Sequence, residues 1–92
     1  EGGAASDPIA VLRAKLDANP TDSSARYDLA KLLFAKNKHE EALNEALALL
    51  RRDRAFNNNA PRALLLDFFA ALGPESQLVK DARKRMTSIL LN

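Results

Sequence analysis

The chain has 92 residues, a formal net charge of +2 and 47% hydrophobic residues, which fits one small globular domain. It contains no cysteine, one histidine and three glycines, which excludes disulfides, zinc–thiolate centres, thiol nucleophiles and glycine-rich phosphate loops. Its longest apolar runs have five residues, at 46–50 and 68–72, whereas a membrane-spanning helix needs about twenty.

Alanine and leucine dominate the apolar residues, whereas the β-branched valine and isoleucine are rare and only 5% of the chain is aromatic. Side chains that lose little freedom in a helix favour helix over sheet. We therefore predict an all-α domain over residues 7–92. Residues 1–6 are typical of a flexible lead-in or a tag scar, and we exclude them from the fold.

The first two predicted helices are bounded by proline, aspartate and asparagine. An aspartate–proline pair at residues 7–8 begins the first helix, and Pro20 stops it. Asp22 or Ser23 caps the second helix, and Asn37 ends it because asparagine tolerates the left-handed conformation. A second apolar face on this helix predicts burial on two sides and carries two aromatic residues, Tyr27 and Phe34.

The third predicted helix covers about residues 38–53. Its inward face is apolar and consists of Ala42, Leu43, Ala46, Leu47, Leu49 and Leu50. Glu40 and Glu41 stand at its start and arginines at its end, which complements the helix dipole. His39 lies beside the two glutamates, but adjacent helical residues point about 100° apart. This arrangement favours a solvated helix end over a metal site.

Residues 57–59 are three asparagines and predict a loop, with Phe56 before them as an apolar staple between two hairpins. Pro61 begins a fourth helix that ends at Leu72, and residues 73–74 separate it from a fifth. The fifth helix also has an apolar face, formed by Leu78, Val79, Ala82, Met86, Ile89 and Leu90. Because every connection is short, successive helices are expected to be antiparallel.

A shift of 36 residues aligns the second and third helices with the fourth and fifth. The turn residue Asn37 then falls on Gly73. The aligned apolar pairs include Leu29 with Leu65, Ala30 with Leu66, Leu33 with Phe69, Ala42 with Leu78, Ala46 with Ala82 and Leu50 with Met86. Matched helices around a matched turn predict a repeated helical hairpin.

The first of these units, residues 23–54, resembles a tetratricopeptide repeat. Leu29, Ala30 and Leu33 match inward positions of that family's first helix, and small residues match the close-packing positions of its second helix, Ala42 and Ala46. The resemblance implies a right-handed stack of antiparallel helical hairpins with five helices. The helix at residues 8–19 would then be the second helix of an earlier repeat.

The sequence departs from this family at three positions. Arg26 stands where an apolar residue is usual, Asn37 replaces a glycine, and Arg54 replaces the closing proline. The second unit matches the family less well than the first.

A narrower resemblance covers residues 9–91 and rests on the order of residues in the second half of the chain. The residues are Arg52-Asp53-Arg54, Asn57, Arg62, Leu65-Leu66, Phe69, Ala71-Leu72-Gly73-Pro74, Leu78-Val79 and Leu90-Leu91. Together they resemble the C-terminal tetratricopeptide region of bacterial thioredoxin-like proteins of the chaperedoxin type. This resemblance implies a non-catalytic part of a cytoplasmic co-chaperone that binds unfolded clients, the chaperonin or both, behind an N-terminal thioredoxin-like domain. It also implies that the end of the last helix, with Ile89, Leu90 and Leu91, docks on the chaperonin.

Two other interpretations stay open: a generic tetratricopeptide adaptor that binds a peptide in its groove, and a structural dimerisation or spacer domain. Because solenoids usually need about three or more repeats, we expect a contact that covers an exposed end. The thioredoxin-like domain or a second copy in a homodimer would supply it. Phe68 and Phe69 are both expected in the core, and Phe68 is also a candidate partner contact.

We predict no catalytic, cofactor-binding or metal site, because no serine has a base partner and no motif supports paired carboxylates. Residues 51–92 hold eight basic and four acidic side chains, with clusters at 51–54 and 83–85. Aromatic residues do not interleave with these clusters, which favours solvated helix ends over nucleic-acid binding. Binding of an acidic partner stays possible, and Asp81 can pair with Arg85 one helical turn away.

Overall fold

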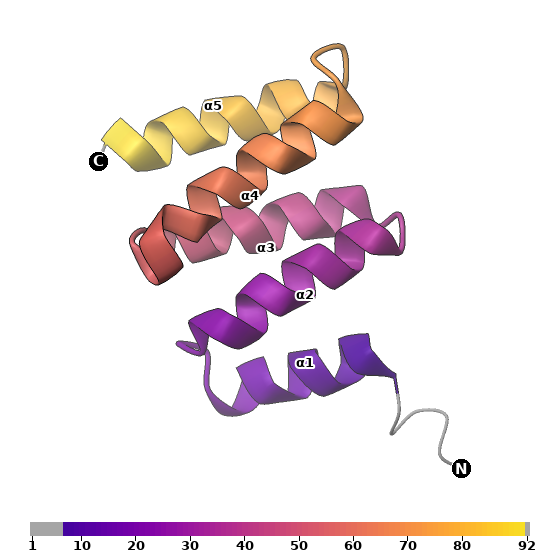
Figure 1. The fold of residues 1–92 in the computed structure, drawn as a ribbon, viewed down its shortest axis with the longest axis vertical. Coiled ribbons are helices and arrows are strands. Elements are labelled where there is room, and N and C mark those ends of the chain that lie inside the picture. Colours follow the sequence, from indigo (N-terminus) through magenta and orange to yellow (C-terminus); the bar gives the residue numbers. More distant parts are fainter. Residues whose placement is uncertain (1–6, 92) are drawn as a thin grey trace.

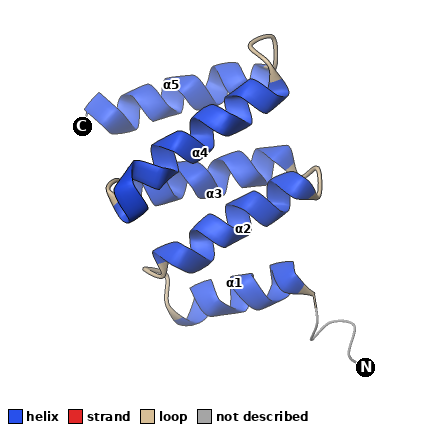
Figure 2. Ribbon diagram, in the orientation of Figure 1, coloured by secondary structure: helices blue, strands red, loops and turns tan. Residues whose placement is uncertain are grey.

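The computed structural model describes residues 7–91, which form five α-helices (Figures 1 and 2). The helices are α1 (Pro8–Ala18), α2 (Ser23–Ala35), α3 (His39–Arg52), α4 (Phe56–Leu72) and α5 (Gln77–Leu91). They stack along the long axis of a body that measures 43 × 26 × 18 Å (Figure 1). The predicted lead-in at residues 1–6 lies outside the described residues.

The helices form antiparallel hairpins, as the short connections predict. In Figure 1, α1, α3 and α5 run in one direction, whereas α2 and α4 run in the opposite direction. The central helix α3 packs against α2, α4 and α5, and α1 packs against α2. The prediction of an all-α stack of five helices in antiparallel hairpins is confirmed.

The predicted helix boundaries are confirmed at the N-terminal end of the stack. Asp7 Oδ1 accepts a hydrogen bond from the amide of Ile9 at 3.0 Å, and Asp22 Oδ1 accepts one from the amide of Ala25 at 3.0 Å. Both bonds satisfy amides that have no partner inside their helix. Asn37 follows α2 with a φ of 65°, the left-handed conformation expected of it.

The start of α4 differs in detail from the predicted loop. Asn57, Asn58 and Asn59 have φ values of 48°, 60° and 65°, so all three are left-handed. They interrupt α4 directly after its first residue, Phe56, and right-handed geometry resumes before Pro61. The predicted loop is therefore a left-handed turn within the bounds of α4. Asparagine suits it because its short polar side chain tolerates this conformation.

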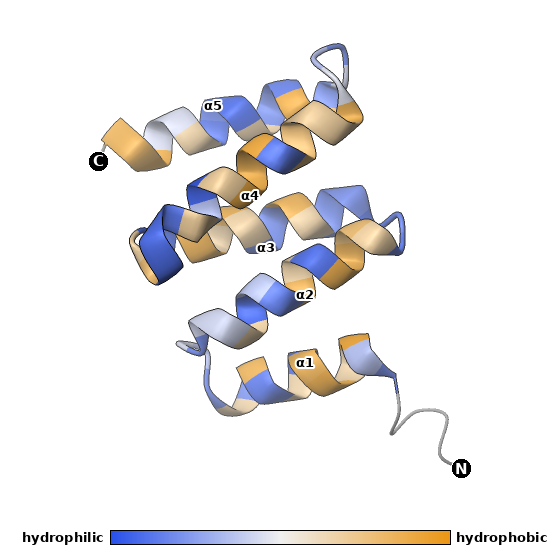
Figure 3. Ribbon diagram, viewed as in Figure 1, coloured by the Kyte–Doolittle hydropathy of each residue, from blue (hydrophilic) through white to orange (hydrophobic). Residues whose placement is uncertain are grey.

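The core runs through the whole stack and contains mostly leucine and alanine. All six residues predicted to face inward from α3 are buried, and so are the predicted α5 residues apart from Leu78 and Leu90, which are half-buried. Figure 3 shows apolar residues interleaved with hydrophilic ones along the helices. In the described part of the chain, no charged or polar residue is fully buried.

Aromatic rings join the two predicted repeat units. The ring of Tyr27 lies 5.8 Å from that of Phe56 between centroids, which confirms that Phe56 staples the hairpins together. The ring of Phe34 stacks on that of Phe68 at 4.2 Å, with only 4° between their planes. Tyr27 and Phe34 thus cover the second apolar face of α2, as predicted.

Candidate partner-binding surfaces

The three residues predicted to dock a partner at the end of α5 have different environments. Ile89 is 7% exposed and belongs to the core, Leu90 is half-buried, and Leu91 is 81% exposed. Successive helical residues are rotated by about 100°, so three consecutive leucine and isoleucine side chains cannot share one face. Leu91 is therefore the member of this set that is presented outward.

The fourth predicted contact, Phe68, lies inside the molecule. Phe68 and Phe69 are 5% and 3% exposed, which confirms that both belong to the core. The ring of Phe68 is covered by Phe34 from α2. Phe68 offers almost no exposed surface in this conformation, and its role in partner binding stays a prediction.

Arg54, which stands in place of the family's closing proline, connects the two repeat units. Its Nη2 donates a hydrogen bond to the backbone carbonyl of Ile89 at 2.8 Å. That carbonyl lies in the last turn of α5, where carbonyls have no partner within the helix. An arginine that follows α3 thus caps the end of α5.

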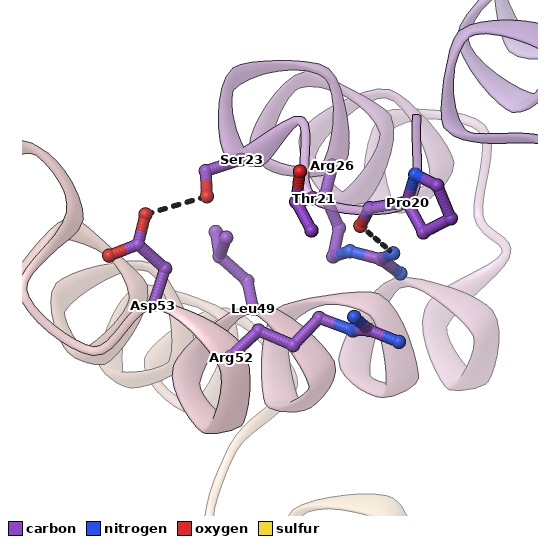
Figure 4. Close-up of a pocket in the computed structure, with 7 residues that line it drawn as sticks. All are labelled: Pro20, Thr21, Ser23, Arg26, Leu49, Arg52 and Asp53. Atoms are coloured by element: carbon purple, nitrogen blue, oxygen red, sulfur yellow. Dashed lines mark hydrogen bonds between the residues drawn. The ribbon is translucent and has the colours of Figure 1, made fainter. Parts of the chain in front are cut away.

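Arg26, another departure from the family, lines a cleft of about 270 Å³ between the α1–α2 connection and the end of α3. Its Nη1 pairs with Glu45 Oε1 at 2.8 Å, and its Nη2 donates to the carbonyl of Pro20 at 3.0 Å. Across the same cleft, the hydroxyl of Ser23 donates to Asp53 at 2.6 Å (Figure 4). Arg26 thus links α2 to α3 and to the connection before α2, and Ser23 links the start of α2 to Asp53 at the end of α3.

The prediction that His39 lies at a solvated helix end is wrong in part. His39 begins α3 but is half-buried, and its ring lies 4.6 Å from that of Phe34 between centroids. The imidazole therefore packs against the ring of Phe34, which also stacks on Phe68. No group of three His, Asp or Glu side chains within residues 7–91 could hold a metal ion.

Asp81 and Arg85 of α5 bind other residues and not each other. Asp81 accepts a hydrogen bond from Gln77 at 2.9 Å, whereas Arg85 Nη1 donates to Asn44 Oδ1 at 2.7 Å. The expected Asp81–Arg85 pair is therefore wrong, because α3 lies close enough to supply Arg85 with an acceptor. Arg83 lies over the ring of Phe69, 5.3 Å from its centroid.

Near the ends of α3 and α5, the structure contains a cleft that sequence reasoning missed. It has a volume of about 220 Å³ and is lined by Arg51, Arg54, Ser88 and Ile89. The 36-residue repeat is a signal that could have indicated this cleft. It aligns the end of α3 with the end of α5, and equivalent positions of stacked repeats lie at the same edge of the stack. Ser88 alone carries no recognisable motif, so the cleft emerges only when α3 and α5 pack together.

These surfaces offer hydrogen bonds, charge and an exposed leucine, which suit the binding of another macromolecule. No helix in residues 7–91 is both long enough and apolar enough to span a membrane.

Comparison with known proteins gives one match. A family model described as tetratricopeptide repeat matches residues 3–91, a range that includes all five helices. No curated protein and no solved structure matches the chain. Repeats of this kind are typically non-catalytic modules for protein–protein interaction. With the match extending over nearly its whole length, the chain belongs to the tetratricopeptide repeat family.

Proposed function

We propose that this chain is the protein-binding repeat region of a thioredoxin-like co-chaperone and that it contacts the chaperonin through the C-terminal end of α5. Membership of the tetratricopeptide family supports protein binding in general. The residue order over residues 9–91 supports the narrower family and, with it, a thioredoxin-like domain in the same protein, unfolded clients and a cytoplasmic location.

The observation that carries the proposed contact is the exposure of Leu91. At 81%, it is the most exposed large apolar side chain in the described part of the chain, ahead of Leu66 at 44% and Val11 at 41%. The packed face of α5 is already supplied by other residues: Val79, Ala82, Met86 and Ile89. Leu91 is therefore not needed for the fold, and burying a leucine against a partner contributes about 1.5–3 kcal/mol.

A pull-down with purified chaperonin tests this proposal. We expect the wild-type chain to capture the chaperonin and Leu91→Asp to abolish capture, because a carboxylate cannot enter an apolar contact without a large desolvation cost. Val11→Asp makes the same change in charge on α1 and is the matched control, expected to retain capture. Circular dichroism should show unchanged helix content in both variants.

Two results would contradict the proposal. Capture that survives Leu91→Asp would exclude α5 as the docking element. If the wild-type chain captures no chaperonin but binds one defined peptide saturably, it is a peptide adaptor instead.

A further inference from the structure

The turn at the start of α4 has a strained backbone. Asn57, Asn58 and Asn59 follow one another with φ values of 48°, 60° and 65°. This left-handed conformation brings Cβ too close to the next carbonyl oxygen, so asparagine adopts it as a single residue and not in runs. Asn37 is such a single residue, because the residues on both sides of it have a negative φ. Three left-handed asparagines in succession therefore make the α3–α4 turn a strained segment.

Local contacts do little to stabilise this turn. The side chains of all three asparagines are exposed. The amide of Asn59 donates to the carbonyl of Ala55 at 3.4 Å, which is long for a backbone hydrogen bond. A strained conformation persists only where the surrounding structure imposes it. The turn is therefore held by the packing of the chain segments on either side of it.

The two segments that impose the turn pack against each other. We call residues 7–56 the N-terminal unit and residues 60–91 the C-terminal unit, which consists of α5 and most of α4 at one end of the stack (Figure 1). A ring stack and two hydrogen bonds join the two units, namely Phe34 with Phe68, Asn44 with Arg85, and Arg54 with Ile89. In each contact one partner belongs to each unit. The N-terminal unit of a second copy therefore offers the C-terminal unit the same partners.

The C-terminal unit needs an N-terminal unit as its neighbour. The apolar face of α5 consists of Val79, Ala82, Met86 and Ile89, and α5 packs along α3. α4 also packs against α3. A single helical hairpin cannot bury its apolar face without a neighbouring repeat. A C-terminal unit that leaves its own N-terminal unit will therefore dock on that of another copy.

We propose that two copies of this chain form a dimer by exchanging their C-terminal units, so that α4 and α5 of each copy pack on α2 and α3 of the other. The exchanged interface is the one already present inside a single chain, so it requires no new complementary surface. Opening the turn releases its left-handed strain, and short strained connections favour such an exchange. The inference concerns assembly of the chain and goes beyond the proposed contact with the chaperonin.

The connection between the two units is long enough for the exchange. Residues 53–60 span about 26 Å when they are extended. The body itself is 26 Å wide across its second axis. A C-terminal unit can therefore reach a second copy that lies beside its own N-terminal unit.

Size-exclusion chromatography with light scattering tests whether the dimer forms. The wild-type chain is unfolded in urea and refolded at about 10 μM and at about 1 mM, because mass action favours the dimer at the higher concentration. We expect a monomer at the lower concentration and a substantial share of dimer at the higher one. A monomer at both concentrations would overturn the proposal.

Two matched triple variants test the role of the turn. Alanine at positions 57, 58 and 59 disfavours the left-handed turn and favours right-handed helix, so the share of dimer should rise several-fold. Glycine at the same positions adopts the left-handed conformation without a clash, so the share of dimer should fall several-fold. Equal shares in the two variants would overturn the proposal. If circular dichroism shows that a triple variant is unfolded, Asn58→Ala and Asn58→Gly give the same comparison.

A mixing experiment distinguishes the exchange from a dimer that forms through exposed side chains. Asn44→Lys places two cations together within one chain, whereas Arg85→Glu leaves an anion beside Asn44. In an exchanged dimer of the two variants, the new lysine meets the new glutamate at one junction and the native Asn44–Arg85 bond forms at the other. We therefore expect native mass spectrometry of the refolded mixture to show mixed dimers in excess over random pairing. Random pairing would show that each copy keeps its own C-terminal unit and would overturn the exchange.

Discussion

The two hairpins α2–α3 and α4–α5 have related sequences but pack differently. In the first hairpin, three alanines at the interface are fully buried, namely Ala30, Ala42 and Ala46. The backbones of α2 and α3 approach closely over much of their length, whereas those of α4 and α5 do not. Leu66 and Leu78 replace two of the three alanines in the second hairpin, and larger side chains keep helix backbones apart.

The second hairpin therefore depends on the first for its position. α5 packs along α3, and Arg54 caps the end of α5 from the connection that follows α3. Leu66 is 44% exposed, whereas the aligned Ala30 is 0% exposed. The repeat is therefore preserved in its helices and its turn, whereas the close interface inside the hairpin is preserved in only one of the two copies.

The largest change in unfolding free energy is expected when Ala30 of the first hairpin is replaced by leucine, the residue at the aligned position 66 of the second hairpin. Ala30→Leu should lower the free energy of unfolding by about 3 kcal/mol, because a leucine does not fit where the backbones are close. The reverse exchange, Leu66→Ala, should cost less than about 1 kcal/mol because Leu66 is half-exposed. Urea unfolding of both variants measures the difference. Similar losses would show that the two hairpins pack alike.

A smaller effect is expected from the ion pairs that surround α3. The side chains of Arg26 and Glu45 are 13% and 22% exposed, so Arg26→Ala leaves a largely buried carboxylate without its partner. We expect a loss of about 2 kcal/mol in unfolding free energy. Arg13→Ala removes the exposed pair with Glu41 and should cost below about 0.5 kcal/mol. Urea unfolding measures both variants. Equal losses of unfolding free energy in Arg26→Ala and Arg13→Ala would show that burial does not make the Arg26–Glu45 pair the stronger of the two.

The smallest effect is expected at the turn that joins the hairpins. Asn58 is exposed and left-handed, so Asn58→Ala removes little packing but puts a less tolerant residue at a φ of 60°. A loss of about 1 kcal/mol is expected. Asn58→Gly should cost nothing measurable, because glycine has no Cβ to clash. Thermal unfolding followed by circular dichroism compares the two, and equal midpoints would argue against strain in this turn.

Most of the helix boundaries could be predicted from the sequence, because they depend on local chemistry. Asp7, Asp22 and Asn37 act within a few residues of their own positions, and each behaves as predicted. The three asparagines before Pro61 predict a break in the helix, but a left-handed turn is one of several conformations that asparagine allows.

The candidate site was less predictable, because its contacts join residues far apart in the chain. Arg85 meets Asn44 across 41 positions, and Arg54 meets Ile89 across 35. Such pairs depend on how closely α3 and α5 lie, which no local pattern specifies. The outward position of Leu91 could be predicted from helical spacing. Met86 and Ile89 belong to the buried stripe of α5, and Leu91 lies off this stripe.

The stack of rings on Phe34 has a consequence for spectroscopy. Phe34 from α2 lies between His39 at the start of α3 and Phe68 from the second hairpin. Ring currents will therefore shift the proton resonances of Phe34 and of His39, the single histidine of the chain. When the second hairpin separates from the first, Phe34 loses one of its two neighbouring rings while His39 keeps its own. Nuclear magnetic resonance can thus distinguish partial opening of the stack from complete unfolding without an added label.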